Sequence, residues 1–323
     1  MAPIAPPIYL AGPTAVGKSA LAMELAESIG GSILSADSMQ VYRGMDIGTA
    51  KPSAVDQARI PHRLIDLVDP DQSFDVQQYV TAAEAALQTE QNGGRIPIVA
   101  GGTGLYLKAL REGLDATPPS DSALRRRLET TALKDLLVEL REKDPVWYDK
   151  IDRKNPRRVI RAIEIMRLTG RPVSQQRRSW QHESAAQLPP MIVLTRSPQN
   201  LRQRIEQRVE TMFIAGLITE TGHLLARGLS NNPTAQQALG YRQVCDYLAG
   251  TRSLPDTIAL VKTKTWQFAR RQLIWFRKQP RIMWLDLDEI PAPQHLHAIL
   301  AAIKSEGPTE SFIDPISTID RGH

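Results

Sequence analysis

The segment Gly12–Ser19, with the sequence GPTAVGKS, constrains the fold of this 323-residue chain more than any other stretch. It fits the pattern G-x-x-x-x-G-K-[ST] and lies between an apolar run at 8–11 and the helical pattern SALAMELAESIG. In this strand-loop-helix setting, glycines let backbone N–H groups face phosphate oxygens, and the helix N-terminus adds positive potential. Lys18 would neutralise the oxygens, and Ser19 could ligate Mg²⁺. The segment predicts a di- or triphosphate site formed by Gly12, Pro13, Thr14, Ala15, Val16, Gly17, Lys18 and Ser19.

Short apolar runs alternate with helical patterns along the first third of the chain. This alternation predicts an α/β fold with a P-loop NTPase-like parallel sheet flanked by helices. Further strands are expected at 32–36, 63–68 and 96–100. The first of these ends at Asp37, and the last runs into the glycine-rich turn 101–104. Because ligands of such sheets bind beyond the carboxyl ends of the strands, we expect the phosphate loop, Asp37 and this turn to meet at one edge.

A helical insertion is predicted in the middle of the chain. From 120 to about 181 the sequence shows helical periodicity and no convincing strand, with Asn155 and Pro156 at the start of one helix and Gly170 after its end. A returning strand is expected at 191–196, and helices follow near 199–228, 234–250 and 255–279. The predicted organisation is a discontinuous core domain of 1–118 and 190–304, an all-helical insertion domain of 119–189 and a flexible C-terminal tail of 305–323.

The net charge of +5 is distributed unevenly along the chain. Residues 1–114 carry 8 basic and 12 acidic side chains, so the excess of basic residues lies entirely in the later part. Two stretches concentrate it: 153–181 holds nine Lys or Arg and a single acidic residue, Glu164, and 262–281 holds seven and no acidic residue. Such runs predict contact with the phosphate backbone of a nucleic acid.

Helical spacing assigns faces to these two stretches. On the helix that begins at Pro156, Arg157 and Arg161 share a face, while Val159, Ile163 and Met166 can point to a core. In the second stretch, a buried stripe is expected on one face of the helix and a basic face opposite it. The stripe consists of Trp266, Ala269, Leu273 and Phe276, and the basic face consists of Lys264, Arg271 and Lys278. Trp275 lies on the basic side, where it could stack on a base or pack against the insertion.

Several classes of protein are excluded or disfavoured by composition. The mean hydropathy of −0.28 and the lack of any apolar run near the length of about 18 residues argue against a membrane protein. The N-terminal residues lack the basic, apolar and small-residue regions of a secretory signal, so we expect a cytoplasmic protein. The single cysteine, Cys245, excludes an internal disulfide and a multi-cysteine zinc site, and we expect it to be a small buried side chain.

Seven motifs occur in order between about residues 8 and 285: GPTAVGKS, DSMQVYRGMDIGTAKP, PHRLIDLVDP, VAGGTGLYLKAL, NPRRVIRAIEI, ALGYRQ and ARRQLIWFR. Together they resemble the bacterial tRNA dimethylallyltransferases, also called the tRNA isopentenyltransferase or IPP transferase family. That family transfers a dimethylallyl group from dimethylallyl diphosphate to N6 of the adenosine immediately 3′ of the anticodon, using Mg²⁺. The resemblance implies that the phosphate loop binds a diphosphate and that no nucleotide is needed.

The resemblance also implies three catalytic residues. Asp37 would be the base that accepts a proton from the adenine amine, Thr103 would orient the reacting groups, and Arg208 of the segment Arg204-Ile-Glu-Gln-Arg208 would stabilise the leaving diphosphate. Two alternatives stay open. Asp37 could position the metal or the adenine without acting as a base, and Arg208 could be an ordinary surface arginine.

The tRNA contacts implied by the resemblance are spread over the whole chain. They include the family's G-Y-R motif, although Gln237 stands where some members have an arginine. The full set is Asp37, Ser38, Met39, Gln40, Thr103, Arg125, Arg157, Arg158, Val159, Ile160, Arg161, Gly240, Tyr241, Arg242, Arg270, Arg271, Trp275 and Arg277. In the family the target base is turned out of the anticodon loop into a channel that the diphosphate enters from its other end. We expect a monomer that binds the anticodon stem-loop of tRNAs reading codons that begin with U.

Two other functions are compatible with parts of the sequence. A small-molecule kinase shares the strand-loop-helix start, but it leaves the basic insertion unexplained, and the best apolar strand, IPIVA, does not end in the metal-binding Asp of many P-loop enzymes. A non-catalytic RNA-binding module leaves the phosphate loop and the segment DSMQVYRGMDIGTAKP unexplained.

Overall fold

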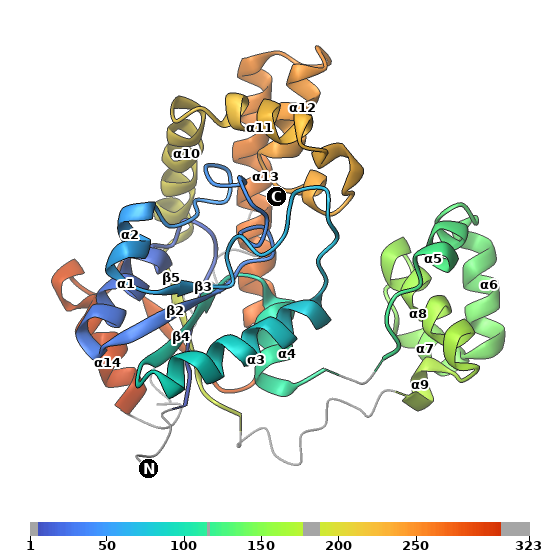
Figure 1. Ribbon diagram of the computed structural model, residues 1–323, viewed down its shortest axis with the longest axis horizontal. Helices are drawn as coiled ribbons and strands as arrows, with labels where there is room; N and C mark the ends of the chain where they lie inside the picture. The colour runs from blue at the N-terminus through green and yellow to red at the C-terminus, as the bar shows by residue number, and fades with distance from the viewer. Residues whose placement is uncertain (1–5, 115–116, 177–187, 305–323) are drawn as a thin grey trace. The chain divides into compact units, whose positions relative to one another are not determined.

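The computed structural model describes residues 6–114, 117–176 and 188–304, and the chain divides into two compact units. The first comprises Met1–Arg111 and Ala185–His323, and the second comprises Glu112–Ser184 (Figure 1). The observed boundaries, after 111 and after 184, therefore lie several residues before the expected junctions after 118 and 189. Pro118 falls in the second unit, where its carbonyl oxygen accepts a hydrogen bond of 2.6 Å from Arg161. The expected tail at 305–323 lies outside the described residues.

A six-stranded parallel sheet forms the centre of the first unit, in the order β3-β2-β4-β1-β5-β6 (Figure 1). The strands are β1 (Ile8–Ala11), β2 (Gly31–Ala36), β3 (His62–Arg63), β4 (Ile96–Gly101), β5 (Met191–Thr195) and β6 (Ile282–Asp286). Ala11 and Ala36 both pair with Gly101, so the ends of β1, β2 and β4 are level. The predicted α/β fold with a parallel sheet is confirmed.

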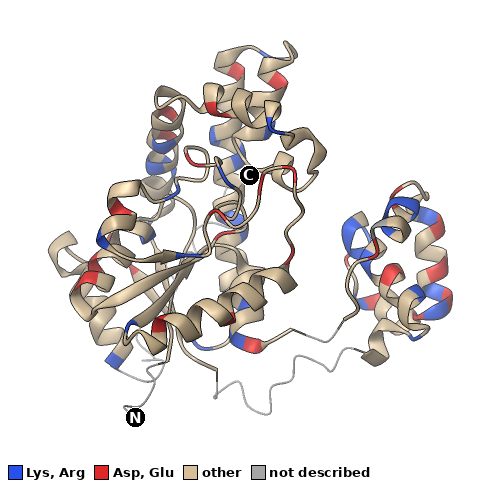
Figure 2. Cartoon of the chain, viewed as in Figure 1, with Lys and Arg blue, Asp and Glu red and all other residues tan. Residues whose placement is uncertain are grey.

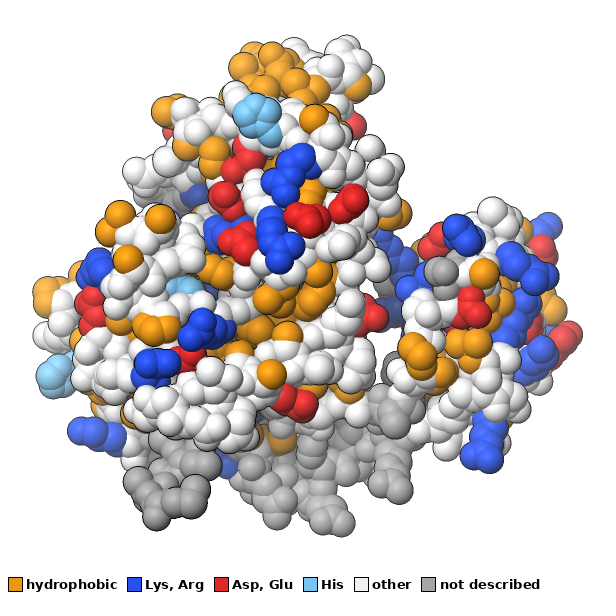
Figure 3. Space-filling view, in the orientation of Figure 1, with side chains coloured by type: hydrophobic (Ala, Val, Ile, Leu, Met, Phe, Trp, Pro, Cys, Tyr) orange, Lys and Arg blue, Asp and Glu red, His pale blue; other side chains and the backbone are white. Residues whose placement is uncertain are grey.

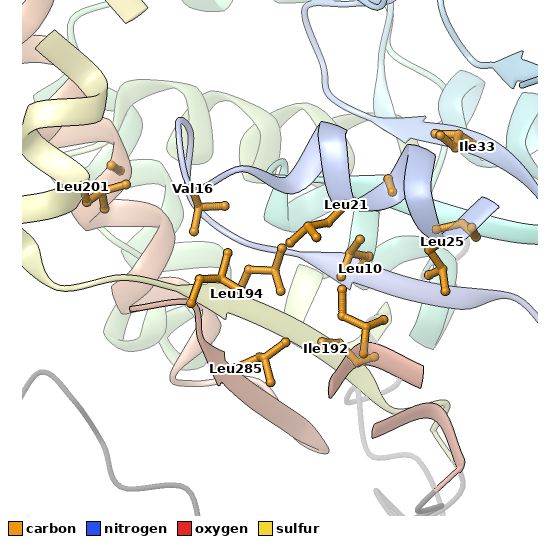
Figure 4. Close-up of a cluster of buried hydrophobic side chains, with 14 of the residues drawn as sticks. Leu10, Val16, Leu21, Leu25, Ile33, Ile192, Leu194, Leu201 and Leu285 are labelled. Atoms are coloured by element: carbon orange, nitrogen blue, oxygen red, sulfur yellow. The ribbon is translucent and has the colours of Figure 1, made fainter. Parts of the chain in front are cut away.

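The two faces of the sheet are covered by different side chains, because successive residues of a strand point to opposite sides. On one face, Leu10, Ile192 and Leu194 pack with Leu21 and Leu25 of α1 (Lys18–Ile29), as Figure 4 shows. On the other, the guanidinium of Arg111 lies 5.9 Å from the centre of the Tyr9 ring. The Tyr79 hydroxyl of α3 (Val76–Asn92) donates to the Ser35 carbonyl oxygen at 3.2 Å. The strand before the phosphate loop is thus buried on both sides.

The strand expected at 63–68 stops at Arg63. Leu64 and Asp66 have positive φ angles of 66° and 53°, which no strand can continue. The N–H groups of Leu67 and Val68 instead donate to the carbonyl oxygen of Val41, at 2.7 and 3.0 Å. Residues 64–68 therefore pair with the long loop after β2 rather than with the sheet.

The helices of the first unit also differ in part from the expected ranges. The helix expected at 199–228 divides at Gly216, which has a φ of 101°. The one expected at 234–250 is shorter, and β6 and the last helix were not predicted at all. The remaining helices are α2 (Ala54–Arg59), α4 (Gly104–Glu112), α10 (Pro198–Ile214), α11 (Leu217–Ala226), α12 (Tyr241–Leu248), α13 (Leu254–Phe276) and α14 (His295–Lys304), with 3-10 turns at Leu229–Asn231, Ala235–Gln237 and Ala292–Gln294.

The second unit is helical, as predicted, and has its own core. Its helices are α5 (Ser122–Glu129), α6 (Leu133–Lys143), α7 (Pro145–Lys150), α8 (Pro156–Thr169) and α9 (Val173–Gln176). Leu128, Leu136 and Leu140 pack against Val159 and Ile163 of α8. Asn155 caps α8 and Gly170 ends it with a φ of 67°, which confirms the bounds expected for this helix. None of the helices in the described segments of either unit combines the length and apolar character needed to cross a bilayer.

Candidate active site

The phosphate loop, Asp37 and the glycine-rich turn meet at one edge of the sheet, as the strand pattern predicted. Lys18 at the start of α1, Asp37 after β2 and Gly102 after β4 line one hollow of about 380 Å³. Arg208 of α10 and Gln272 of α13 line the same hollow, so helices from the C-terminal part of the chain complete the site. The hollow contains the residue types that bind phosphate together with the carboxylates of Asp37 and Asp56.

Two arginines hold the phosphate loop from outside. The Nε of Arg204 donates to the Ala15 carbonyl oxygen at 2.8 Å, and the Nε of Arg196 donates to the Val16 carbonyl oxygen at 2.9 Å. Arg196 is itself held by Asp288, with 2.8 Å between Nη1 and Oδ1. These contacts fix the backbone of the loop at Ala15 and Val16. Gly17, with a φ of 109°, then starts α1 in a conformation that favours glycine.

A single amide side chain connects the phosphate loop with the glycine-rich turn. Gln272 Oε1 accepts from the Thr14 N–H at 2.9 Å, and its Nε2 donates to the Gly102 carbonyl oxygen at 2.9 Å. A Cβ atom at Gly102 would lie 2.3 Å from that Nε2, so this approach requires glycine. Gln272 was not predicted from the sequence, because its contacts with Thr14 span 258 positions.

The cations of the hollow are partly deprived of water. Burial, with a further effect of the positive charge on Arg208, lowers the pKa of Lys18 to about 8, against a smaller opposing effect of Asp37. Burial also lowers the pKa of Arg208, and Asp37 opposes this shift. Charges that are costly in the free protein are compensated when an anion binds between them. The hollow is therefore suited to a small ligand with several negative charges.

Asp37 and Thr103 are held by backbone hydrogen bonds. Asp37 Oδ1 accepts from the Met39 N–H at 2.9 Å, and Thr103 Oγ1 accepts from the Ser38 N–H at 3.0 Å. The Thr103 N–H donates to the Ala36 carbonyl oxygen at 3.0 Å. The segment after β2 and the turn after β4 are thereby fixed to each other, with the carboxylate at their junction.

Asp37 and Arg208 lie where two hollows meet. The second hollow, of about 330 Å³, shares Thr14, Asp37 and Arg208 with the first. Its other lining residues include Ser38, Met39, Thr103, Gln237 and Arg271. A site open to two hollows can receive one reactant from each side, with the carboxylate and the guanidinium at the point of contact.

The four arginines of the second unit that were expected to contact RNA divide into two groups. Arg157 and Arg158 are exposed on the first turn of α8. Arg161 and Arg125 instead bind the buried carboxylate of Glu164, at 2.7 and 2.6 Å, and Ser120 Oγ donates to it at 2.9 Å. Although burial favours the neutral acid, these hydrogen bonds lower the pKa of Glu164. Figure 2 marks the positions of Lys and Arg along the helices of the second unit, and Figure 3 shows basic side chains on the visible face of that unit.

Four residues of the expected RNA contact set are buried, which corrects that part of the prediction. Val159 and Ile160 pack in the core of the second unit, so their side chains cannot contact RNA. Gly240 is buried, and the Tyr241 side chain is fully buried between α11, α12 and the loop after β2. Arg242 of the same motif is exposed, and its Nη1 donates to Gln237 Oε1.

The expected faces of α13 are largely confirmed. Ala269, Leu273 and Phe276 are buried, Trp266 is partly buried, and Lys264, Arg270, Arg271, Arg277 and Lys278 are exposed. Trp275 is half-buried: a Cβ atom at Gly104 would lie 2.5 Å from its ring. The indole therefore packs on the start of α4, within the first unit.

Comparisons with known proteins agree with this geometry. The model of the IPP transferase family matches residues 40–279, and that of the isopentenyl transferase family matches residues 7–64. A tRNA dimethylallyltransferase of Syntrophobacter fumaroxidans is 41% identical over 94% of this chain and 88% of its own length. One of Geobacter metallireducens is 41% identical over 86% of this chain and 92% of its own length.

Solved structures are similar over nearly the whole chain. The full-length tRNA isopentenylpyrophosphate transferase of Bacillus halodurans superposes with a TM-score of 0.69 at 36% identity, over 93% of this chain and 95% of that one. A eukaryotic dimethylallyltransferase acting on tRNA superposes with a TM-score of 0.76 at 28% identity, over 94% of this chain and 80% of that one. The phosphate loop, the paired hollows and these similarities lead to one assignment: the chain belongs to the IPP transferase family.

Proposed function

We propose that this protein transfers a dimethylallyl group from dimethylallyl diphosphate to N6 of the adenosine 3′-adjacent to the anticodon, in tRNAs that read codons beginning with U. The observation that carries the proposal is the junction of two hollows at Asp37 and Arg208. One hollow contains the phosphate loop, and the other opens beside Arg271 and Gln237. A diphosphate ester and a base turned out of an RNA loop would meet there. Family membership supports the same reaction.

In this reaction the C–O bond between the allyl group and the diphosphate breaks, and a C–N bond to N6 forms. Negative charge grows on the departing diphosphate, so Lys18, Arg208 and the loop N–H groups would bind it more tightly as the bond breaks. The adenine amine is a weak nucleophile because its lone pair is delocalised into the ring. Asp37 would accept the proton that N6 loses, while Thr103 orients the base or a phosphate oxygen.

The residues at the loop fit a phosphate-bound Mg²⁺. Ser19 lies beside Lys18, is exposed, and lines the hollow that Asp37 also lines. Among the described residues, no group of three or more His, Cys, Asp or Glu side chains could hold a metal on its own. This agrees with a cation held by one hydroxyl, phosphate oxygens and water, as Mg²⁺ prefers. Such an ion would neutralise charge on the diphosphate.

The tRNA would contact the exposed cations of both units. Arg157 and Arg158 on α8, Arg270 and Arg271 on α13, and Arg277 directly after α13 are exposed and fit a phosphate backbone. We also propose that the protein acts as a monomer in the cytoplasm on an anticodon stem-loop.

One incubation tests this function. Purified protein, Mg²⁺ and unmodified tRNA are combined with labelled dimethylallyl diphosphate, or with labelled ATP in a parallel reaction. We expect label in the tRNA, at the adenosine next to the anticodon, only with the allylic donor. Phosphoryl transfer from ATP to a small molecule would support the kinase instead, and tRNA binding without transfer would support a non-catalytic RNA-binding module.

A further inference from the structure

The loop 46–51 forms a wall shared by the hollows of the site. Thr49 lines both hollows that meet at Asp37, and Ala50 and Lys51 line the one that contains the phosphate loop. The Thr49 carbonyl oxygen lies 3.3 Å from Gln40 Nε2 and 3.5 Å from Arg208 Nη2. The Thr49 carbonyl oxygen is thus an acceptor for the Arg208 guanidinium.

The carboxylate of Glu220, on α11, binds the backbone of this loop. Its Oε2 accepts from the Ile47 N–H at 2.8 Å and from the Asp46 N–H at 3.3 Å. Its Oε1 lies 3.4 Å from the Gly48 nitrogen, which donates to it. Three consecutive N–H groups thus converge on one charged acceptor, and hydrogen bonds to an ionised group are the stronger ones.

The buried hydroxyl of Tyr241 joins the loop to this carboxylate. It donates to Glu220 Oε1 at 2.6 Å and accepts from the Gly48 N–H at 3.1 Å. Burial and the neighbouring Glu220 raise the pKa of Tyr241, so the hydroxyl stays protonated and remains a donor. A Cβ atom at Gly48 would lie 2.4 Å from the Tyr241 ring, so glycine is required for this contact.

The other end of the loop is held by Lys51. Its side chain is only 3% exposed, and its Nζ lies 2.5 Å from Asp46 Oδ1 and 2.7 Å from Asp66 Oδ1. It also donates to the Tyr42 carbonyl oxygen at 2.9 Å. The loop is therefore fixed at both ends, by Lys51 on one side and by Glu220 with Tyr241 on the other.

We propose that Glu220 and Tyr241 are positioning residues for the diphosphate-binding arginine. By fixing the backbone at 46–48, they place the Thr49 carbonyl group, which in turn orients Arg208 towards the site. The Tyr241 side chain is fully buried in this structure, so it is not exposed for the tRNA contact expected of it. The inference rests on the proposed function in one respect: it takes diphosphate as the ligand of the hollow that Arg208 lines.

Removal of the hydroxyl tests this role. Tyr241→Phe is expected to weaken the binding of inorganic diphosphate and to lower kcat, each by about tenfold. A displaced Arg208 guanidinium would no longer lie beside the diphosphate, where negative charge develops during the reaction. The Kd for tRNA should stay within twofold. Tyr247→Phe removes a hydroxyl from the same helix and should change none of these quantities. Diphosphate binding is measured by calorimetry and tRNA binding by filter retention.

A second variant tests the same positioning role if Tyr241→Phe folds poorly. Glu220→Gln has the same shape but a weaker acceptor, and it should reduce diphosphate affinity and kcat in the same proportion. A rise in tRNA Kd with unchanged diphosphate affinity would overturn the proposal and restore Tyr241 as an RNA contact. Unchanged diphosphate affinity in both variants would also overturn it. If the wild-type protein binds diphosphate but transfers no allyl group, the proposed function fails, and the binding results still decide this inference.

Discussion

The cations of the phosphate-loop hollow and those of the helical insertion are arranged in opposite ways. Lys18 and Arg208 face an enclosed hollow, and burial lowers the pKa of each. On the insertion, Arg157 and Arg158 are exposed on the first turn of α8, while Arg161 is neutralised by Glu164. Both regions handle phosphate in the proposed reaction, so the chemical group alone does not explain the difference.

The difference reflects what each region must do with the phosphate. In an enclosed site a few cations act at short range in a medium that screens them little, which suits a leaving group whose charge grows during the reaction. On an open surface, cations act through water and release counterions, which gives affinity without a fixed geometry. Changes in the hollow should therefore affect the rate, and changes on α8 should affect tRNA affinity and its dependence on salt.

The largest effect is expected for Lys18→Met, which removes a charge from the hollow and keeps the length of the side chain. We expect kcat/KM for dimethylallyl diphosphate to fall by about a thousandfold, at the upper end for loss of one preorganised electrostatic contact. The Kd for tRNA should not change. Steady-state kinetics and a tRNA-binding titration measure the two quantities, and a parallel loss of tRNA affinity would break the comparison.

Asp37→Ala should lower the single-turnover rate by at least about a hundredfold, because general-base assistance contributes a factor of this size. Little tRNA affinity should be lost. Glu24→Gln, which neutralises an exposed carboxylate on α1, is the matched control and should leave the rate unchanged. If the single-turnover rate of the Asp37 variant equals that of the wild type, Asp37 is not the base and only positions the metal or the adenine.

The double variant Arg157→Gln/Arg158→Gln should weaken tRNA binding by about tenfold at physiological salt. The slope of log Kd against log salt should fall by about 1 to 2, since each phosphate contact contributes slightly less than one. Affinity for dimethylallyl diphosphate should be unaffected. Arg202→Gln, at an exposed arginine on α10, controls for the loss of charge alone.

Arg161→Gln sharpens the same comparison. It removes one partner of the buried Glu164 carboxylate, so it should lower the melting temperature of the insertion while the salt slope changes little. A slope change as large as that of the double variant would mean that Arg161 leaves Glu164 to bind RNA.

The smallest effect concerns pH. Lys18 is fully protonated well below its pKa of about 8 and loses its charge as pH rises through that value. Diphosphate affinity of the free protein should therefore weaken by up to about tenfold between pH 7 and pH 9. Calorimetry at pH 8.5 in buffers of different ionisation enthalpy should show proton uptake on binding. In Lys18→Met this proton uptake should disappear.

Local patterns in the sequence predicted which segments meet at the sheet edge. The phosphate loop, Asp37 and the turn at 101–104 each follow a short apolar strand, and parallel strands bring such ends together. The bounds of α8 were also predicted, because Asn155 and Gly170 are local signals of helix ends.

Contacts between distant segments could not be predicted in the same way. Nothing near Gln272 indicates that its amide joins Thr14 to Gly102, and nothing near Glu220 indicates that it binds the backbone at 46–48. Arg161 had the spacing of a surface cation, yet Glu164, the single acidic residue of its stretch, holds it. Residue type and spacing can be read from the sequence, but the tertiary arrangement determines which partners these side chains have.

The position of β1 between β4 and β5 has a consequence for how the protein is made. The strand that carries the phosphate loop emerges first from the ribosome, but β5, Arg196, Arg204 and Gln272 follow only after the insertion has been synthesised. The insertion is one continuous stretch with its own core, so it can fold while the sheet is still incomplete. A nascent chain therefore contains all residues of the insertion core before it contains those that complete the phosphate-loop site.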